Sequence, residues 1–476
     1  MGQSTTLTIS NNQDVVNVIN DHAKSKVSLF ITLVALGGIM IDAYQAAMVG
    51  FGNKYIAAQF GISQGLAATV NASVLVAALV GGLIANWVIN RYGQKKAFII
   101  GLGLCTLGAA AVAFAGSIWE VLVWRVVMGV GLGIDFPLAT NAVAELQGAK
   151  QKKSSTSVNL WQMAWYVSTT IVFAVLLPMN LSGVEDPLLW RYGIFIGAVF
   201  AFIIMVLRFF LIGESATWAA RTGKLQLAKE ILKTRYGIDV EVKLDAKAKE
   251  DAASSIQVNN FTAYKLMFSK RYFKRSVLGC VVATMQAWQY NAVGVYLPLT
   301  LGGILGNQLT AALGGSAIVN LVFGVTGGAI GSILVAKFGS RRLSMFGFAM
   351  VTILLLLLGT SAAENPSLAI LMLGGIIFFH SSGPGGLGMT IATMSYPPCI
   401  RPAGIGFARA IMRSGAIAGL ILWPILWGTM RTDAFFLLAL VPFVGWLTCV
   451  LIKWEPVGYN VDAEDEECLE KIKELS

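Results

Sequence analysis

Five ionisable side chains stand within strongly apolar stretches of this sequence. They are two carboxylates, Asp42 and Asp135, and three guanidinium groups, Arg125, Arg409 and Arg413. Such a group inside a membrane span costs about 2.5–3.5 kcal/mol on insertion scales, so it needs a partner or a cavity. A carboxylate there can bind and release a proton, and an arginine can hold an anion; the alternative is a buried ion pair that locks helices together. The sequence predicts proton coupling at Asp42 first and Asp135 second, anion binding at Arg413, and a place for Arg409 near a helix end.

A second polar group lies in the apolar stretch near 277–300. Amides and aromatic rings alternate there, in Gln286, Trp288, Gln289, Asn291 and Tyr296. Side-chain amides both donate and accept hydrogen bonds, which suits hydroxyls or a carboxylate. With Gln162 from an earlier stretch, these residues are predicted to bind a small polar molecule; the alternative is hydrogen bonding between helices. The lone His380 is expected to be hydrogen-bonded rather than titrating.

The elements that must position these residues are membrane helices. The chain has 476 residues, of which 56% are hydrophobic and 13% charged, with a mean hydropathy of +0.70. Soluble domains carry about 25% charged residues. Because open sheet cannot exist in hydrocarbon, the apolar stretches must be helices. We predict twelve spans, near 27–50, 66–89, 97–115, 118–144, 156–179, 191–212, 277–300, 311–336, 343–361, 367–394, 403–428 and 433–452.

Lysines and arginines give the predicted orientation. The connections after even-numbered spans hold 23 of them, whereas those after odd-numbered spans hold only Lys54, Arg191 and Arg431. The positive-inside rule therefore places both termini and the central loop in the cytoplasm, and it accounts for the net charge of +10 without nucleic acid. We expect a cytoplasmic tail over 1–26, six-helix halves over 27–213 and 276–453, and a central loop over 214–275 with a helix near 218–236. We also expect an acidic cytoplasmic tail over 454–476, with disorder over Asp462–Glu467.

The two halves contain an internal repeat. Residues 80–101 and 326–347 align without gaps at an offset of 246, with five identical pairs, four of them glycines. A basic–aromatic–Gly–x–basic–basic turn recurs in the same register. Duplication of a six-helix unit is the organisation of many secondary transporters, whose site lies at the repeat interface near the midplane.

The repeated turns carry a specific resemblance. Asn90-Arg-Tyr-Gly-Gln-Lys-Lys96 and Ala336-Lys-Phe-Gly-Ser-Arg-Arg342 resemble the loop between spans 2 and 3 of the major facilitator superfamily and its copy between spans 8 and 9. Arg125-Val-Val-Met-Gly-Val-Gly-Leu-Gly133 is similar to that family's motif in span 4, where the glycines can also serve packing alone. The segment from Gly213-Glu-Ser to Gly-Lys224 resembles a box of sugar porters and related bacterial metabolite transporters.

This resemblance implies the major facilitator fold, an all-α membrane protein with twelve transmembrane helices in two pseudo-symmetric halves. It implies that Arg125 is the partner of the carboxylates in spans 1 and 4. It also assigns gating roles at the cytoplasmic motifs to Asn90, Arg91, Gly93, Glu145, Lys337, Gly339 and Arg401. The acidic residue usual in the repeated loop is replaced by Asn90 and Ala336, and Met394 replaces the glutamate expected before Arg401.

A second resemblance points to proton–phosphate symporters. Ile41-Asp-Ala-Tyr44, Gly133-Ile-Asp-Phe-Pro-Leu-Ala-Thr140 and the spacing of Trp288 and Tyr296 are similar to theirs. Two positions depart from that pattern, because Ala292 stands where those symporters have an acidic residue and Arg413 where they have a lysine.

Other function classes find no support in the sequence. Five scattered cysteines form no CxxC pair, and no HExxH, GxSxG or Walker A pattern occurs. We therefore expect no enzyme, no catalytic residue, no cofactor and no metal. The prediction is a monomeric, proton-coupled symporter of the inner (cytoplasmic) membrane whose partners are H⁺, lipid and a small substrate: a sugar or polyol, favoured by residues 286–296, or an organic anion, favoured by Arg413. The alternatives are a proton–phosphate symporter and a non-transporting sensor with the same fold.

Overall fold

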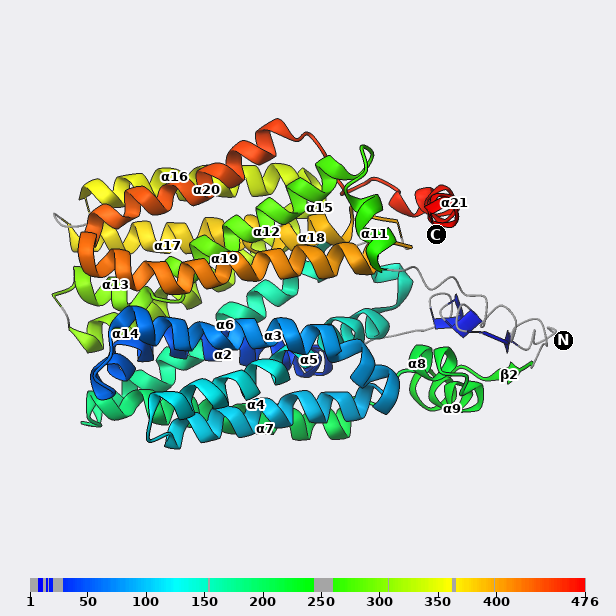
Figure 1. Ribbon diagram of the computed structural model, residues 1–476, viewed down its shortest axis with the longest axis horizontal. Helices are drawn as coiled ribbons and strands as arrows, with labels where there is room; N and C mark the ends of the chain where they lie inside the picture. Colours follow the sequence, from blue (N-terminus) through cyan, green and yellow to red (C-terminus); the bar gives the residue numbers. More distant parts are fainter. Residues whose placement is uncertain are drawn as a thin grey trace.

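The computed structural model describes residues 7–11, 14–15, 17–19, 29–152, 155–243, 260–306, 308–361, 365–397 and 399–475. Almost all of this part of the chain is helical, and long helices lie side by side in one bundle (Figure 1). Nine segments among the described residues are long and apolar enough to cross a membrane, and one of them, Ala403–Leu451, contains two helices. The predicted all-α membrane fold is confirmed.

Helices occupy all twelve predicted spans. The first six are α2 (Leu29–Gln59), α3 (Gln64–Tyr92), α4 (Gln94–Phe114), α5 (Ile118–Lys152), α6 (Ser155–Leu181) and α7 (Asp186–Leu211). The second six are α12 (Phe273–Val293) with α13 (Leu297–Ile304), α14 (Leu309–Ile318) with η1 (Val319–Val325) and α15 (Thr326–Phe338), α16 (Ser340–Ser361), α17 (Pro366–Ser382) with α18 (Pro384–Thr393), α19 (Arg401–Met430) and α20 (Ala434–Leu451).

Spans 7, 8 and 10 of the second half are interrupted. Span 7 breaks between α12 and α13, and span 10 breaks at Gly383, within the Ser-Gly-Pro-Gly-Gly sequence. Span 8 winds as a π-helix over η1. Irregular backbone inside a membrane protein is tolerated where it is buried or lines a cavity, and π-helical turns are frequent at functional sites. These interruptions lie close to the polar residues described below.

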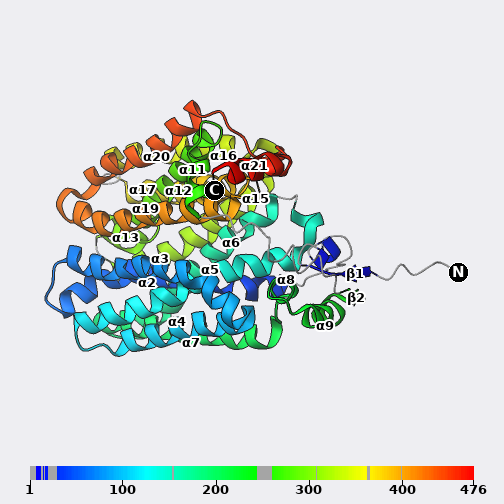
Figure 2. The ribbon, with the colours of Figure 1, turned by 45° about the vertical axis from the view of Figure 1, so that its right-hand side comes forward.

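The two halves lie beside each other. In Figure 1 and in the turned view of Figure 2, α2 to α7 form one block and α12 to α20 the other. They meet where α6 packs against α14 and α15, and where α3 packs against α19. Within the first half, α3 and α5 approach closely because Gly81 and Gly133 have no side chain. A Cβ atom at Gly81 would collide with the carbonyl oxygen of Val130, and one at Gly133 with that of Ala78. The glycines of the span 4 motif therefore serve helix packing.

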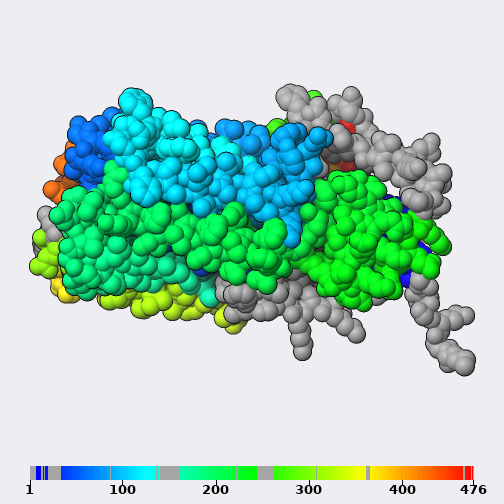
Figure 3. All heavy atoms as spheres, turned by 90° about the horizontal axis from the view of Figure 1, so that it is seen from below, coloured from blue at the N-terminus to red at the C-terminus, as the bar shows by residue number. Residues whose placement is uncertain are grey.

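A small extramembrane lobe stands at one end of the bundle, visible at the right in Figure 3. It comprises α8 (Ala216–Arg221), α9 (Leu225–Tyr236) and the strands β1 (Leu7–Ile9) and β2 (Val240–Val242), which pair in parallel. The basic helix expected near 218–236 is thus two short helices. The N-terminal strand β1 joins the lobe by backbone pairing with β2. The polar composition of the first 26 residues gave no indication of this strand.

The C-terminal tail contradicts our expectation of an unstructured segment. A 3₁₀ turn, η3 (Val461–Glu464), leads into α21 (Asp465–Leu475), and α11 (Asn260–Met267) packs against that helix. Cys468 and Ile472 are buried in a cluster with Met267 and Tyr396. Cys468 and Ile472 are four residues apart, so they lie on one face of α21 and form an apolar stripe on a helix rich in charged residues.

Candidate functional site

An ion pair joins the two halves. Arg413 of α19 donates a hydrogen bond from Nη2 to Oδ2 of Asp42 of α2, at 3.2 Å. The side chains retain 10% and 12% of their accessible surface, so solvent still reaches both. Among the ion pairs of the described residues, this is the one that connects α2–α7 with α12–α20.

A second buried pair lies wholly within the first half. Arg208 of α7 binds Asp135 of α5, and its other nitrogens donate to the carbonyl oxygens of Val34 (3.0 Å) and Ala35 (2.8 Å) of α2. Both charged side chains are only 1% exposed. Since one guanidinium holds three helices together in a sealed place, this pair is suited to a structural task.

Arg125 does not make the predicted contacts. The two carboxylates are held by Arg413 and Arg208 instead, and none of the nitrogens in the Arg125 side chain has a hydrogen-bond partner among the described residues, although the residue is 1% exposed. Arg208 was missed because it lies near the end of an apolar stretch, where an arginine ordinarily extends to the membrane surface. The sequence feature that could have singled out Arg208 is its position five residues before the Gly213-Glu-Ser box.

Aromatic and amide side chains meet across the two halves beside the broken helices. Nε1 of Trp165 in α6 donates to the hydroxyl of Tyr290 in α12 at 2.6 Å. The ring of His380 in α17 stacks on Tyr290, and its Nδ1 lies 2.7 Å from Oε1 of Gln289. Here His380 is hydrogen-bonded, as we expected.

Two amide atoms beside this cluster are buried without a partner among the described residues. They are Nε2 of Gln289, a donor, and Oε1 of Gln162, an acceptor. Gly385 of α18 lets Gln162 and His380 approach its backbone, because a Cβ atom there would lie 2.7 Å from Nε2 of Gln162 and 2.8 Å from Nε2 of His380. Buried polar atoms are nearly always satisfied, so an unsatisfied donor and an unsatisfied acceptor on residues of this cluster indicate groups that a ligand can bind.

The other predicted binding residues lie along span 7. Gln286 is buried and Trp288 is partly exposed, while Asn291 donates to the carbonyl oxygen of Ala287 in its own helix. Tyr296 is fully buried and donates to the carbonyl oxygen of Leu420. The contacts of Asn291 and Tyr296 are those of packing residues. Their predicted roles in binding remain predictions.

The repeated loops are built alike. Gly93 and Gly339 have φ angles of 88° and 86°, which favour glycine, and each precedes a helix N-terminus. Glu214 accepts from the backbone N–H of Gln94 at 2.6 Å, and Glu455 accepts from that of Ser340 at 2.8 Å. The acidic partner that the loops lack in sequence is therefore supplied from the segments after spans 6 and 12.

The other gating candidates lie outside the clusters described above or outside the described side chains. Arg91 and Lys337 are exposed, and Arg401 donates from Nε to the carbonyl oxygen of Tyr396 at 3.0 Å. The side chains of Asn90 and Glu145 lie outside the described residues.

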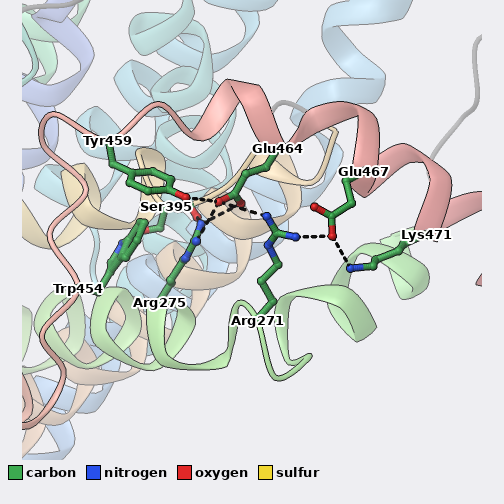
Figure 4. A network of polar contacts seen from close by, with 8 residues as sticks. All are labelled: Arg271, Arg275, Ser395, Trp454, Tyr459, Glu464, Glu467 and Lys471. Atoms are coloured by element: carbon green, nitrogen blue, oxygen red, sulfur yellow. Dashed lines mark hydrogen bonds and ion pairs between the residues drawn. The ribbon is translucent and has the colours of Figure 1, made fainter.

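The C-terminal tail lies at the end of the bundle that carries the lobe (Figure 1), and Figure 4 shows its polar contacts with the second half. Arg275 at the start of α12 binds Glu464 through two nitrogens, at 3.1 and 3.0 Å, and lies 3.9 Å from the ring centre of Trp454. Burial acts to raise the pKa of Glu464, but hydrogen bonds from Arg275 and Tyr459 outweigh it and the pKa falls below its usual value. The carboxylate is thus charged and paired at neutral pH.

Comparison with known proteins agrees with this architecture. The sequence profile of the family described as "Sugar (and other) transporter" matches residues 25–460. The chain belongs to this family. Its fold is that of the major facilitator superfamily: the solved structure of the xylose transporter XylE from Escherichia coli, in a partially occluded inward-open conformation, superposes with a TM-score of 0.73 at 19% identity and covers 90% of this chain and 98% of that chain.

Two relatives extend over nearly the whole family region. The inner membrane metabolite transport protein YgcS of Escherichia coli (strain K12) is 24% identical over 430 residues, covering 90% of this chain and 91% of its own length. The arabinose-proton symporter of Bacillus subtilis (strain 168) is 23% identical over 425 residues, covering 87% and 86%. The predicted resemblance to sugar-porter-like bacterial metabolite transporters is confirmed.

Proposed function

We propose that this chain is a proton-coupled secondary transporter that carries a small polar metabolite across the cytoplasmic membrane by alternating access. Membership of a transporter family supports the class, and relatives named as a proton symporter and as an inner membrane protein support the coupling and the location. The lobe and the tail lie on the cytoplasmic side in this proposal, as the basic connections require.

The Asp42–Arg413 pair carries the proposal. It is partly accessible and spans the two halves, and alternating access moves the halves against each other. If the contact between Asp42 and Arg413 is made and broken in each cycle, the surroundings of Asp42 alternate. Beside the Arg413 guanidinium the carboxylate is stabilised as an anion, and away from it the neutral form is favoured. Asp135 lacks this freedom, because Arg208 holds it within one half.

The amide and aromatic cluster is the proposed substrate pocket. Gln162 and Trp165 of the first half face Gln289, Tyr290 and His380 of the second, so a molecule bound there contacts both halves. The free donor on Gln289 and the free acceptor on Gln162 can bind hydroxyl, carbonyl or ring-nitrogen groups. Gln286, Trp288 and Arg413 complete the proposed set.

Uptake into proteoliposomes tests this function. A thermal-shift screen over sugars, polyols, sugar acids, aromatic acids and phosphate first identifies a bound substrate. Wild-type protein is then expected to accumulate it against a gradient when the outside is acidic. The Asp42→Asn protein should retain counterflow but lose accumulation, while Asp186→Asn, at an exposed aspartate, should behave as wild type. If Asp42→Asn still concentrates substrate under a pH gradient, Asp42 is not the coupling group.

A further inference from the structure

We infer that Arg125 binds a small monovalent anion, either an inorganic ion or the carboxylate of an organic acid, which enters from the end of the bundle opposite the lobe. This site is separate from the proposed substrate pocket. The inference does not rest on transport, because the binding is measured on the purified protein. It follows from a buried cation for which the described residues supply no anion.

The guanidinium of Arg125 is buried without a hydrogen-bond partner. Arg125 is 1% exposed, and its Nε, Nη1 and Nη2 atoms find no acceptor in the part of the chain that the structure describes. Arg208 is equally buried, but it binds a carboxylate and two backbone carbonyl oxygens. Because a buried charge is ordinarily paired and hydrogen-bonded, the described contacts of Arg125 lack an anionic group.

The carboxylates on α5 and on the helices packed against it do not fill this role. Asp42 of α2 and Asp135 of α5 bind arginines of α19 and α7. Glu120 is exposed and accepts hydrogen bonds at the start of α5, while Glu145 follows Arg125 by 20 residues, about 30 Å along a helix. The other helices that contact α5, which are α3, α4 and α6, contain no acidic residue.

The basic residues of these helices supply no negative charge either. Apart from Lys54 near the end of α2, those of α2, α3 and α4 lie where α3 ends and α4 begins, at Arg91, Lys95 and Lys96. In the second half, Arg409 lies eight residues inside α19, although we expected it near a helix end. It interacts electrostatically with Asp42 and Arg413, so it belongs to the charged group around Asp42.

Arg125 lies close to the boundary between the two halves. It interacts electrostatically with Tyr296 of span 7, which belongs to the second half. The hydroxyl of Tyr296 donates to the carbonyl oxygen of Leu420 at 3.0 Å. A neutral phenol does not compensate a full positive charge, so this neighbour leaves room for an anion as the partner of Arg125.

A pocket leads toward this place from the end of the bundle where α13 and α14 lie, opposite the lobe in Figure 1. It has a volume of about 190 Å³ and lies between the halves. Gly50 of α2 lines it and packs on the carbonyl oxygen of Val295, the residue before Tyr296. The other lining residues used here are Asn53, Lys54 and Gln64 of the first half and Pro298 and Arg431 of the second.

A buried amide lies between the pocket and Arg125. Asn71 of α3 donates to Oδ1 of Asn53 at 2.8 Å, and its own Oδ1 is buried with no partner among the described residues. Gly129 and Gly133 of α5 lie against the carbonyl oxygens of Val74 and Ala78 of α3. The same register, continued by one turn, brings Arg125 to the level of residues 70–71. The polar groups therefore extend from the pocket inward to the guanidinium.

Charge and size define the ligand. One guanidinium compensates one negative charge, and its planar shape binds a carboxylate through two parallel hydrogen bonds. The pocket is smaller than the roughly 300–1,000 Å³ of sites for drug-sized ligands, so it suits a small ion. Lys54 and Arg431 at the mouth raise the local concentration of anions.

Thermal unfolding of the purified protein tests the inference. The sodium salts of chloride, nitrate, acetate and benzoate are titrated into a low-salt HEPES buffer, with sulfate as a divalent comparison. At least one monovalent anion should raise the unfolding midpoint of the wild type by about 3 °C or more, with saturation, as binding to the folded state requires. Stabilisation by chloride and nitrate identifies an inorganic ion as sufficient, and stabilisation by acetate or benzoate alone identifies an organic acid.

Three variants locate the site. Arg125→Met should lose the anion response, and its midpoint in the low-salt buffer should equal or exceed that of the wild type, because a buried unpaired charge has been removed. Misfolding cannot produce that second result. Arg191→Met, which removes an arginine that donates to two carbonyl oxygens, should keep the response. Lys54→Gln should weaken the apparent affinity by about threefold at low ionic strength and not at high ionic strength.

Three results would overturn the inference: no response of the wild type to any of the four monovalent anions, an equal response of Arg125→Met, or loss of the response in Arg413→Gln instead. If Arg125→Met does not fold, a crystal of the wild type grown with bromide or 4-bromobenzoate decides. An anomalous peak beside Arg125 supports the site, and peaks only elsewhere, or none, contradict it. Anion binding without any substrate transport would refute the proposed function and leave this inference standing.

Discussion

The buried pair between Asp135 and Arg208 makes a quantitative prediction about stability. In Arg208→Met the carboxylate of Asp135 stays buried without its cation, and the carbonyl oxygens of Val34 and Ala35 lose a donor. Removing one member of a buried ion pair costs about 3–5 kcal/mol. We expect this loss in the free energy of unfolding, measured in mixed micelles by titration with sodium dodecyl sulfate.

A matched control isolates the charge. Arg191 also donates to two carbonyl oxygens, those of Ala113 (2.7 Å) and Ala115 (2.8 Å), but it has no carboxylate partner among the described residues. Arg191→Met should therefore cost only about 1–2 kcal/mol, the net value of two hydrogen bonds. The double variant Asp135→Asn/Arg208→Met removes both charges and should recover about 2 kcal/mol of the loss. Equal destabilisation by Arg208→Met and Arg191→Met, or no recovery in the double variant, would refute the structural role.

Three further predictions concern the C-terminal tail and the orientation of the chain in the membrane. Glu464→Gln should release α21, so that the buried Cys468 becomes reactive to maleimide at pH 7 in a protein without the other cysteines, whereas Glu474→Gln, at an exposed position, should leave it protected. The pKa of Glu464 is lowered in the docked tail, so its charged carboxylate stabilises docking at every pH above its ordinary pKa, and this stabilisation is lost as the pH falls through the lowered pKa. A spin label at position 474 should therefore stay immobile from pH 8 to 5 and become mobile only in stronger acid. In intact cells, a cysteine replacing the exposed Glu230 should resist an impermeant reagent and one replacing the exposed Lys54 should react; the reverse pattern would invert the topology.

The helices were predictable because the bilayer constrains them strongly. Each span is a stretch of apolar residues of about the length that crosses hydrocarbon, and backbone satisfaction forces it to be helical. The turns at Gly93 and Gly339 were predictable because a positive φ angle calls for glycine. The sequence also pointed to Asp42 and Arg413, since charge inside an apolar stretch requires an explanation.

The pairing of these charges was not predictable. Asp42 and Arg413 are 371 residues apart, and nothing local to either residue shows that the other lies opposite. Family resemblance suggested Arg125 as the partner, but the three-dimensional packing of α7 brings Arg208 to Asp135 instead. The tail was misjudged for a related reason: its acidic composition hid the apolar stripe of Cys468 and Ile472, which only the partner surface makes meaningful.

Proton movement during substrate entry tests the central claim most directly. Proteoliposomes that contain a pH-sensitive dye are supplied with the substrate identified by the thermal-shift screen, without an imposed pH gradient. Wild-type protein is predicted to acidify the lumen in step with substrate uptake, with one proton for each substrate molecule. The Asp42→Asn protein, in vesicles also loaded with unlabelled substrate, is predicted to admit labelled substrate by exchange with no change in lumenal pH. Acidification by Asp42→Asn at the wild-type ratio would contradict the account, because the proton would then travel on another group.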